Sequence, residues 1–238
     1  MTTPSRSSRT RVAAGLAALA LCVGACGSDD TSSATTDGDA SAAAEVAGTA
    51  ATVAPDTSEQ ASSGEPQQTS TITVSGEPLA TFDDGPADAA VGTSAPIVEG
   101  ESFDGTPVTI GGATGSATMV VFLAHWCPHC NDEVPVLVEM SDSGTFPDDV
   151  DVVAVSTAVD PSQPNFPPSE WLDSEGWPWR VVADDTELSA LRAFGAASFP
   201  FTVVLDAEGT VLARRAGEAT AEQTTAFLDD ALASAGSA

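Results

Sequence analysis

Two cysteines separated by two residues, Cys127 and Cys130, are the side chains in this sequence best suited to redox chemistry. Such a pair closes a disulfide with little backbone movement when the second cysteine lies one turn into a helix. The first cysteine then lies at the helix N-terminus, where unpaired N–H groups and the helix dipole favour a thiolate. Pro128 suits the first helical position, because its missing N–H is not needed there. The spacing predicts that Cys127 is the exposed nucleophile and Cys130 the more buried resolving thiol of disulfide exchange.

Metal and haem chemistry fit these residues less well. A zinc site takes four ligands, often from two such pairs, but His125 and His129 are crowded into the same short stretch as the one pair. Asn131 follows the second cysteine, so the C-x-x-C-H sequence of covalent haem attachment is absent. We therefore predict no metal and no cofactor.

The pair must be positioned by a strand and a helix. Residues 119–124 form a continuous apolar run, typical of a central strand covered on both faces, and they lead directly into Trp126 and Cys127. A helix is predicted over 128–141, with a kink at Pro135. Further predicted elements are a hairpin within 96–110, strands at 150–157 and 179–183, helices at 169–175, 186–194 and 221–233, and a hairpin of 201–205 with 211–216. This order predicts an α/β fold with a central mixed β-sheet.

The N-terminal part of the chain has the composition of a targeting segment followed by a tether. An apolar run over 12–23 follows a positively charged start and is too short to span a bilayer as a mature helix. It ends in V-G-A-C at Cys26, which resembles the bacterial lipobox. The resemblance implies a lipoprotein signal peptide at 1–25 and lipid attachment to Cys26. Residues 26–90 are predicted to be a disordered low-complexity tether, and 91–238 to be the folded domain.

The charge of the chain limits its partners. A formal net charge of −28 excludes nucleic acid, because the chain would repel the phosphates. We expect a solvated acidic surface and a monomer.

Residues 91–238 resemble the thioredoxin superfamily and, within it, the TlpA/ResA-like extracytoplasmic oxidoreductases. The residues that carry the resemblance are F-L-A-H-W-C at 122–127, Pro135, and F-P-F-T-V at 199–203. The resemblance implies a three-layer thioredoxin-like fold whose central mixed β-sheet is flanked by helices.

The same resemblance assigns roles around the two cysteines. Pro200 is expected in the cis form, which turns the backbone of Phe199 toward the disulfide and lets it pair with an extended substrate segment. Trp126 is expected to pack against the site and shape the docking surface. Glu133 matches a glutamate that lines the active-site cavity in ResA-like proteins, and it is expected to handle protons.

The resemblance also implies the function of a membrane-anchored thiol-disulfide oxidoreductase on the extracytoplasmic face. Such a protein exchanges disulfides with exported proteins and with a membrane-bound redox partner. Cys-Pro-His-Cys resembles the strongly oxidising DsbA-type site, in which a histidine beside the thiolate makes the disulfide more oxidising. On the strength of His129 we favour an oxidant.

Three alternatives stay open. The first is a TlpA/ResA-like reductant for cytochrome c maturation. The second is a non-enzymatic redox-sensing or binding module. The third is a peroxidase, which is disfavoured because Ala124 stands where that group has a threonine.

Overall fold

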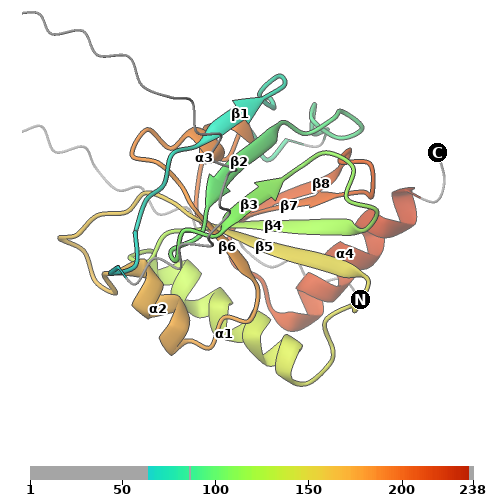
Figure 1. The fold of residues 1–238 in the computed structure, drawn as a ribbon. Coiled ribbons are helices and arrows are strands. Elements are labelled where there is room, and N and C mark those ends of the chain that lie inside the picture. Colours follow the sequence, from blue (N-terminus) through green and yellow to red (C-terminus); the bar gives the residue numbers. More distant parts are fainter. Residues whose placement is uncertain (1–63, 86, 236–238) are drawn as a thin grey trace, which may run out of the picture. The chain divides into compact units, whose positions relative to one another are not determined.

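The computed structural model describes residues 64–85 and 87–235 of the chain (Figure 1). The elements are β1 (Thr73–Ser75), β2 (Ile97–Glu101), β3 (Pro107–Ile110), β4 (Ala117–Leu123), α1 (Pro128–Asp142), β5 (Val150–Ser156), α2 (Pro168–Ser174), β6 (Arg180–Ala183), α3 (Ser189–Ala193), β7 (Phe201–Leu205), β8 (Val211–Ala216) and α4 (Ala221–Ala235). The predicted signal peptide and its lipid-attachment site, Cys26, lie outside the described residues.

A five-stranded mixed sheet forms the centre of the fold, in the order β6-β5-β4-β7-β8. Strand β4 is parallel to β5 and antiparallel to β7, while β6 and β8 form the two edges. Residues 118–123 of β4 are all buried, as expected for the continuous apolar run in the sequence. The predicted α/β fold with a central mixed sheet is confirmed.

The two faces of this sheet are covered by different elements (Figure 1). Successive side chains of a strand point to opposite faces, so Val121 of β4 packs with α1, α2 and α4, whereas Phe122 packs with α3 and the small sheet. That small sheet is antiparallel, in the order β1-β2-β3. Helices therefore flank both faces, and the small sheet completes the layer that contains α3.

The folded unit begins before residue 91, so the predicted boundary of the tether is too late. Strand β1 pairs with β2, and Leu79 and Ala90 are buried. The backbone N–H of Leu79 donates to the carbonyl of Ala193 in α3 at 2.8 Å. Asp88 forms an ion pair with the buried guanidinium of Arg214 on β8. These contacts are with distant parts of the chain, and the local pattern of prolines and glycines does not reveal them.

Helix α3 is shorter than the predicted span of 186–194. Leu188 has left-handed backbone angles (φ 60°, ψ 41°), so a right-handed helix cannot pass through it. Asp184 is fully buried, and its carboxylate accepts the backbone N–H of Ala190 at 2.9 Å. The Asp184 carboxylate thus binds a backbone N–H of the first turn of α3, and the helix begins at Ser189 rather than at the predicted residue 186.

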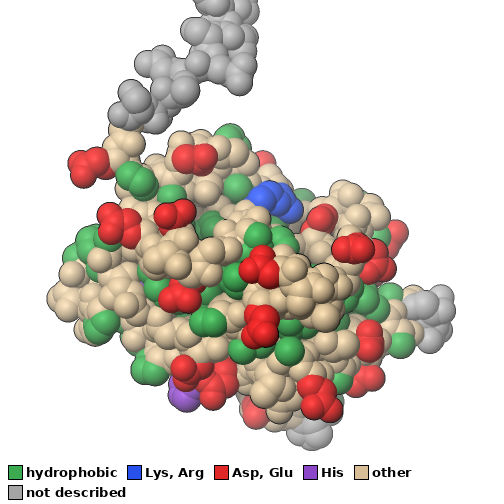
Figure 2. All heavy atoms as spheres, turned by 90° about the horizontal axis from the view of Figure 1, so that it is seen from below, with side chains coloured by type: hydrophobic (Ala, Val, Ile, Leu, Met, Phe, Trp, Pro, Cys, Tyr) green, Lys and Arg blue, Asp and Glu red, His purple; other side chains and the backbone are tan. Residues whose placement is uncertain are grey.

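The described surface is acidic. Figure 2 shows Asp and Glu side chains scattered over the face seen from below, with Arg in one place. No helix in the part of the chain that the structure describes is long and apolar enough to cross a membrane.

Candidate active site

The two cysteines lie where β4 passes into α1. Cys127 is the N-cap of α1, with extended backbone angles (φ −77°, ψ 121°), and Pro128 opens the helix. The carbonyl of Cys127 accepts the N–H of Asn131 at 3.1 Å, which closes the first helical turn. Cys127 therefore lies beside the unpaired N–H groups of the helix N-terminus, the position that favours a thiolate.

The two thiols have different surroundings. Both cysteines are free, and Cys127 is 7% exposed whereas Cys130 is 0% exposed. Burial raises the pKa of the Cys130 thiol well above its usual range, and the nearby charges of Cys127 and Glu133 act in the same direction. Cys127 is therefore less exposed than predicted, but it is the more accessible of the two thiols, and Cys130 is the thiol that holds its proton.

Phe199 and Pro200 reach the site from the loop before β7. Their peptide bond is cis, and the Cys127 thiol donates to the carbonyl of Phe199 at 3.6 Å. The Phe199 ring meets the Trp126 ring edge to face, with centroids 6.0 Å apart. The structure therefore brings together the three segments that the sequence predicts at the site: Trp126, the dithiol and the cis-proline loop.

Glu133 lies on α1 one turn after Cys130, and its side chain is 1% exposed. Oε1 accepts a hydrogen bond from Nη2 of Arg215 on β8 at 2.9 Å. Burial raises the pKa of Glu133 to about 7, although the charge of Arg215 acts in the opposite direction. The second oxygen, Oε2, has no hydrogen-bond partner among the described residues. This carboxyl group can therefore hold or release a proton near neutral pH.

Arg215 is the partner that sequence reasoning does not find. Its guanidinium lies over the Phe227 ring of α4, 4.9 Å from the centroid. Burial lowers the pKa of Arg215, while the Glu133 charge opposes that change. The two paired residues are 82 positions apart in the sequence, and no local pattern links them.

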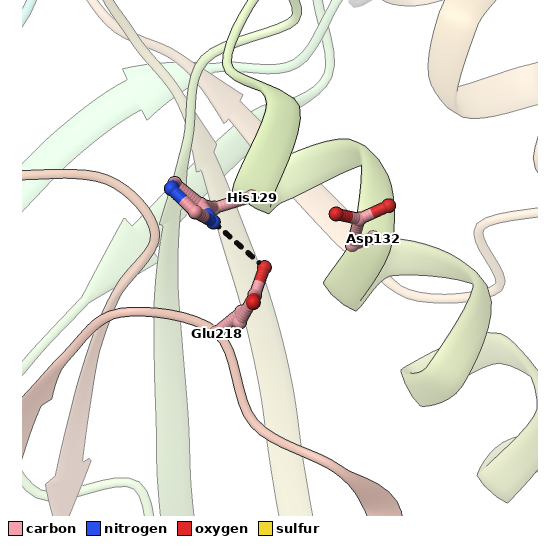
Figure 3. A group of neighbouring side chains, drawn as sticks. All are labelled: His129, Asp132 and Glu218. Carbon is pink, nitrogen blue, oxygen red and sulfur yellow. Dashed lines mark hydrogen bonds and ion pairs between the residues drawn. The ribbon is translucent and has the colours of Figure 1, made fainter.

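His129 lies on the exposed side of the first turn of α1 (Figure 3). Its Nδ1 lies 2.8 Å from Oε2 of Glu218, which follows β8. Asp132 of α1 lies beside them, and one potential ligand atom from each of the three residues falls within 4.8 Å of the others. All three side chains are exposed, so this group is a solvated polar cluster at the rim of the dithiol.

His125 is 0% exposed. It lies between β4 and the cysteines, and both ring nitrogens contact the loop that follows β5. Its burial is consistent with a packed residue.

Comparison with known proteins gives a family and relatives. The Redoxin family matches residues 90–232. Thiol:disulfide interchange protein CycY of Rhizobium leguminosarum bv. viciae is 30% identical over 106 residues, which are 44% of this chain and 53% of that protein. Methylamine utilization protein MauD of Paracoccus denitrificans is 29% identical over 126 residues, 52% of this chain and 58% of that protein. The chain thus spans about half the length of the curated relatives it matches.

A solved structure supports the fold. A DsbF homologue from Corynebacterium diphtheriae superposes with a TM-score of 0.53 and 19% identity, over 65% of this chain and 99% of that chain. At this identity the likeness concerns the fold alone.

Proposed function

We propose, from the premise that this chain belongs to the Redoxin family, that it is a thiol-disulfide oxidoreductase acting through Cys127 and Cys130. The observation that carries the proposal is the difference in position and burial between the two thiols. Cys127 is the N-cap of α1, whereas Cys130 lies one turn later and is fully buried. In a dithiol catalyst the accessible sulfur forms the mixed disulfide with the partner, and the buried sulfur resolves it. The relative CycY is named a thiol:disulfide interchange protein, which supports the same chemistry.

In the oxidising direction the protein starts with a Cys127–Cys130 disulfide. A substrate thiolate attacks Sγ of Cys127, the Cys127–Cys130 bond breaks, and Cys130 leaves as a thiolate that takes up a proton. A second substrate thiolate then attacks the substrate sulfur of the mixed disulfide, forming the substrate disulfide and releasing Cys127 as a thiolate. Two electrons pass from the substrate dithiol to the protein. The reducing direction runs the same steps backward.

Glu133 is proposed to handle the Cys130 proton. Cys130 must lose a proton before it can attack a mixed disulfide, but burial raises its pKa. A carboxyl group with a pKa of about 7, one turn further along α1, can accept that proton and return it at neutral pH. Arg215 holds the carboxylate form in place by its hydrogen bond to Oε1.

The direction of electron flow depends on the charge beside Cys127. His129 lies in the first turn of α1, and a histidine beside the thiolate stabilises the reduced form, which favours an oxidant. One observation favours the reductant instead. The Glu218 carboxylate lies 2.8 Å from Nδ1 of His129 and brings negative charge to the same turn. We propose the oxidant and keep a reductant for cytochrome c maturation as the second candidate.

We also propose that the protein is anchored at the extracytoplasmic face of the membrane, and that it exchanges disulfides with exported proteins and with a membrane-bound redox partner. Its support is the lipobox-like sequence at Cys26 and the family resemblance. Palmitate labelling of the protein in a bacterial host, with Cys26→Ala as the control, tests the anchor. Label retained by the variant would overturn it.

The decisive experiment measures the reduction potential of the Cys127–Cys130 pair by equilibration with glutathione. A value near about −120 mV indicates an oxidant, and a value near or below about −250 mV indicates a reductant. Catalytic turnover of a dithiol or disulfide substrate distinguishes an enzyme from a redox sensor. If neither direction shows turnover, the enzymatic proposal is wrong and the sensing module takes its place.

A further inference from the structure

His125 uses both ring nitrogens on one loop. Its Nδ1 lies 2.7 Å from the carbonyl oxygen of Pro164, and the backbone N–H of Asp160 donates to its Nε2 at 3.2 Å. A neutral imidazole has one donor and one acceptor, so the tautomer with its proton on Nδ1 satisfies both contacts. The ring is 0% exposed, and two hydrogen bonds therefore fasten the loop to the segment that carries the cysteines.

The backbone of His125 is held by the same loop. Its carbonyl accepts from the side-chain amides of Asn131 at 3.2 Å and Asn165 at 3.1 Å. Asn165 also donates to the side-chain oxygen of Asn131 at 2.8 Å. The loop is thus tied both to the residue two positions before Cys127 and to the first turn of α1.

A further contact links the loop to the aromatic rim of the site. The indole N–H of Trp126 donates to the carbonyl of Ala158 at 2.8 Å. The other side of the rim is Phe199, whose ring meets the Trp126 ring. Trp126 is therefore held from two sides, by the loop and by Phe199.

The loop of residues 158–167 contains neither a helix nor a strand, so its shape depends on these contacts. Ala158 and Asn165 have left-handed backbone angles (φ 50° and 61°), which non-glycine residues seldom adopt without support. Phe166 is 42% exposed, yet its ring lies 6.0 Å from the His125 ring in an edge-to-face contact. An exposed aromatic ring in a fixed place suits contact with an apolar side chain of a partner.

We propose that His125 is a positioning residue that fixes loop 158–167 beside Cys127, so that Phe166 contacts an apolar side chain next to the cysteine of an extended polypeptide substrate. The inference rests on the proposed exchange function and narrows its substrate. A small thiol carries no apolar side chain beside its sulfur, so its reaction does not depend on the Phe166 contact. Polypeptides with an apolar residue near the cysteine are favoured.

The test uses the full chain with its dithiol oxidised and measures the rate of reduction by three probes. These are dithiothreitol, an unstructured two-cysteine peptide with leucines flanking the cysteines, and the same peptide with serines in place of leucines. The variants are His125→Leu, which removes both ring contacts, and His125→Gln, whose amide can restore the acceptor for the Asp160 N–H. Phe166→Ser removes the exposed ring, and Val91→Ser is the matched control, since Val91 is 48% exposed and lies outside the loop.

We expect His125→Leu and Phe166→Ser to slow reduction by the leucine peptide by about tenfold or more, the scale on which loss of an aromatic interface residue weakens binding. Dithiothreitol and the serine peptide should change little, His125→Gln should recover part of the loss, and Val91→Ser should behave as wild type. Because Phe166 is exposed, its variant keeps the test informative even if His125→Leu fails to fold.

Equal slowing of all probes, or no slowing of the leucine peptide by Phe166→Ser, would overturn the inference. If the wild-type protein reacts with none of the probes, the exchange function itself is wrong, and that outcome is distinct from a loss of selectivity.

Discussion

Replacing Glu133 by glutamine is expected to remove a pH-dependent part of the free energy of unfolding. The pKa of this carboxyl group is raised from 4.5 to about 7 in the folded protein, mainly by burial. Between those two values the native state holds a proton that the unfolded state has released. Stability from this group is therefore fully present below pH 4.5 and is lost as the pH rises to about 7.

The size of the effect follows from the same two values. At about 1.4 kcal/mol per pH unit, the change from 4.5 to about 7 corresponds to about 3 kcal/mol. The side chain is 1% exposed, so solvent screens this energy little. Glutamine keeps an oxygen that can accept the Arg215 hydrogen bond but has no titrating group, so the variant should lack this dependence on pH.

The assay is urea unfolding of both proteins, followed by tryptophan fluorescence at several pH values from 4.5 to 8. We expect the wild type to lose about 3 kcal/mol relative to Glu133→Gln across this range. Other titrating groups are present in both proteins and cancel in the difference. Glu139→Gln, at an exposed position of the same helix, controls for the substitution itself.

Parallel stability profiles for the wild type and Glu133→Gln would refute this reasoning. The carboxyl group would then be ionised throughout, and it could not exchange protons with Cys130 near neutral pH. If the profiles diverge as expected, Glu133→Gln should also slow the resolution of a mixed disulfide at pH 7 by about a hundredfold, the lower end of what proton transfer contributes.

Three further predictions concern the dithiol and its surroundings. Cys130→Ser should accumulate a mixed disulfide on Cys127 that mass spectrometry detects, whereas the same adduct on Cys127→Ser would reverse the assigned roles. His129→Ala should make the reduction potential more negative by about 30 mV, which corresponds to about 1.4 kcal/mol of thiolate stabilisation; an unchanged potential in glutathione equilibration would remove the argument for an oxidant. Asp88→Ala should lower the free energy of unfolding by about 3 kcal/mol, because the buried charge of Arg214 loses its only carboxylate partner among the described residues and keeps only backbone carbonyls. A loss below about 1 kcal/mol in urea titrations would show that the ion pair contributes little.

The centre of the fold and the dithiol are predictable because local sequence determines them. An uninterrupted apolar run specifies a doubly covered strand such as β4, and Cys127 and Pro128 fix the start of the helix that follows. The resemblance to the thioredoxin superfamily, predicted from residues 122–127 and 199–203, is confirmed by the family match and the fold. The residues around the cysteines are close in the sequence or belong to that resemblance.

The remaining features depend on contacts between distant segments. The Glu133–Arg215 pair joins α1 to β8, and the His129–Glu218 contact joins α1 to the loop after β8. No local sequence pattern indicates that Arg215 or Glu218 lies near the cysteines. The left-handed backbone at Leu188 is equally hidden, because leucine has no local preference for that conformation.

The adjacent arginines of β8 show how one dipeptide serves both fold and chemistry. Neighbouring residues of a strand point to opposite faces. Arg214 binds Asp88 and the carbonyls of Ala80 and Phe194, so it holds the N-terminal segment that precedes β2 against the end of α3. Arg215 faces α1 and α4 and binds Glu133.

The chain has seven arginines and lysines against 35 acidic residues, and two of these cations form ion pairs on β8. Each pairs with a carboxylate from a distant part of the chain, and one partner of each pair is buried: Arg214 in the first and Glu133 in the second. Exchanging Arg215 for glutamine should therefore affect proton transfer at Cys130 more than stability of the N-terminal segment, and exchanging Arg214 should do the reverse. Measuring the rate of mixed-disulfide resolution and the free energy of unfolding in urea for each single variant separates the two roles. Equal effects of both substitutions on both measurements would show that the two faces of β8 are not independent.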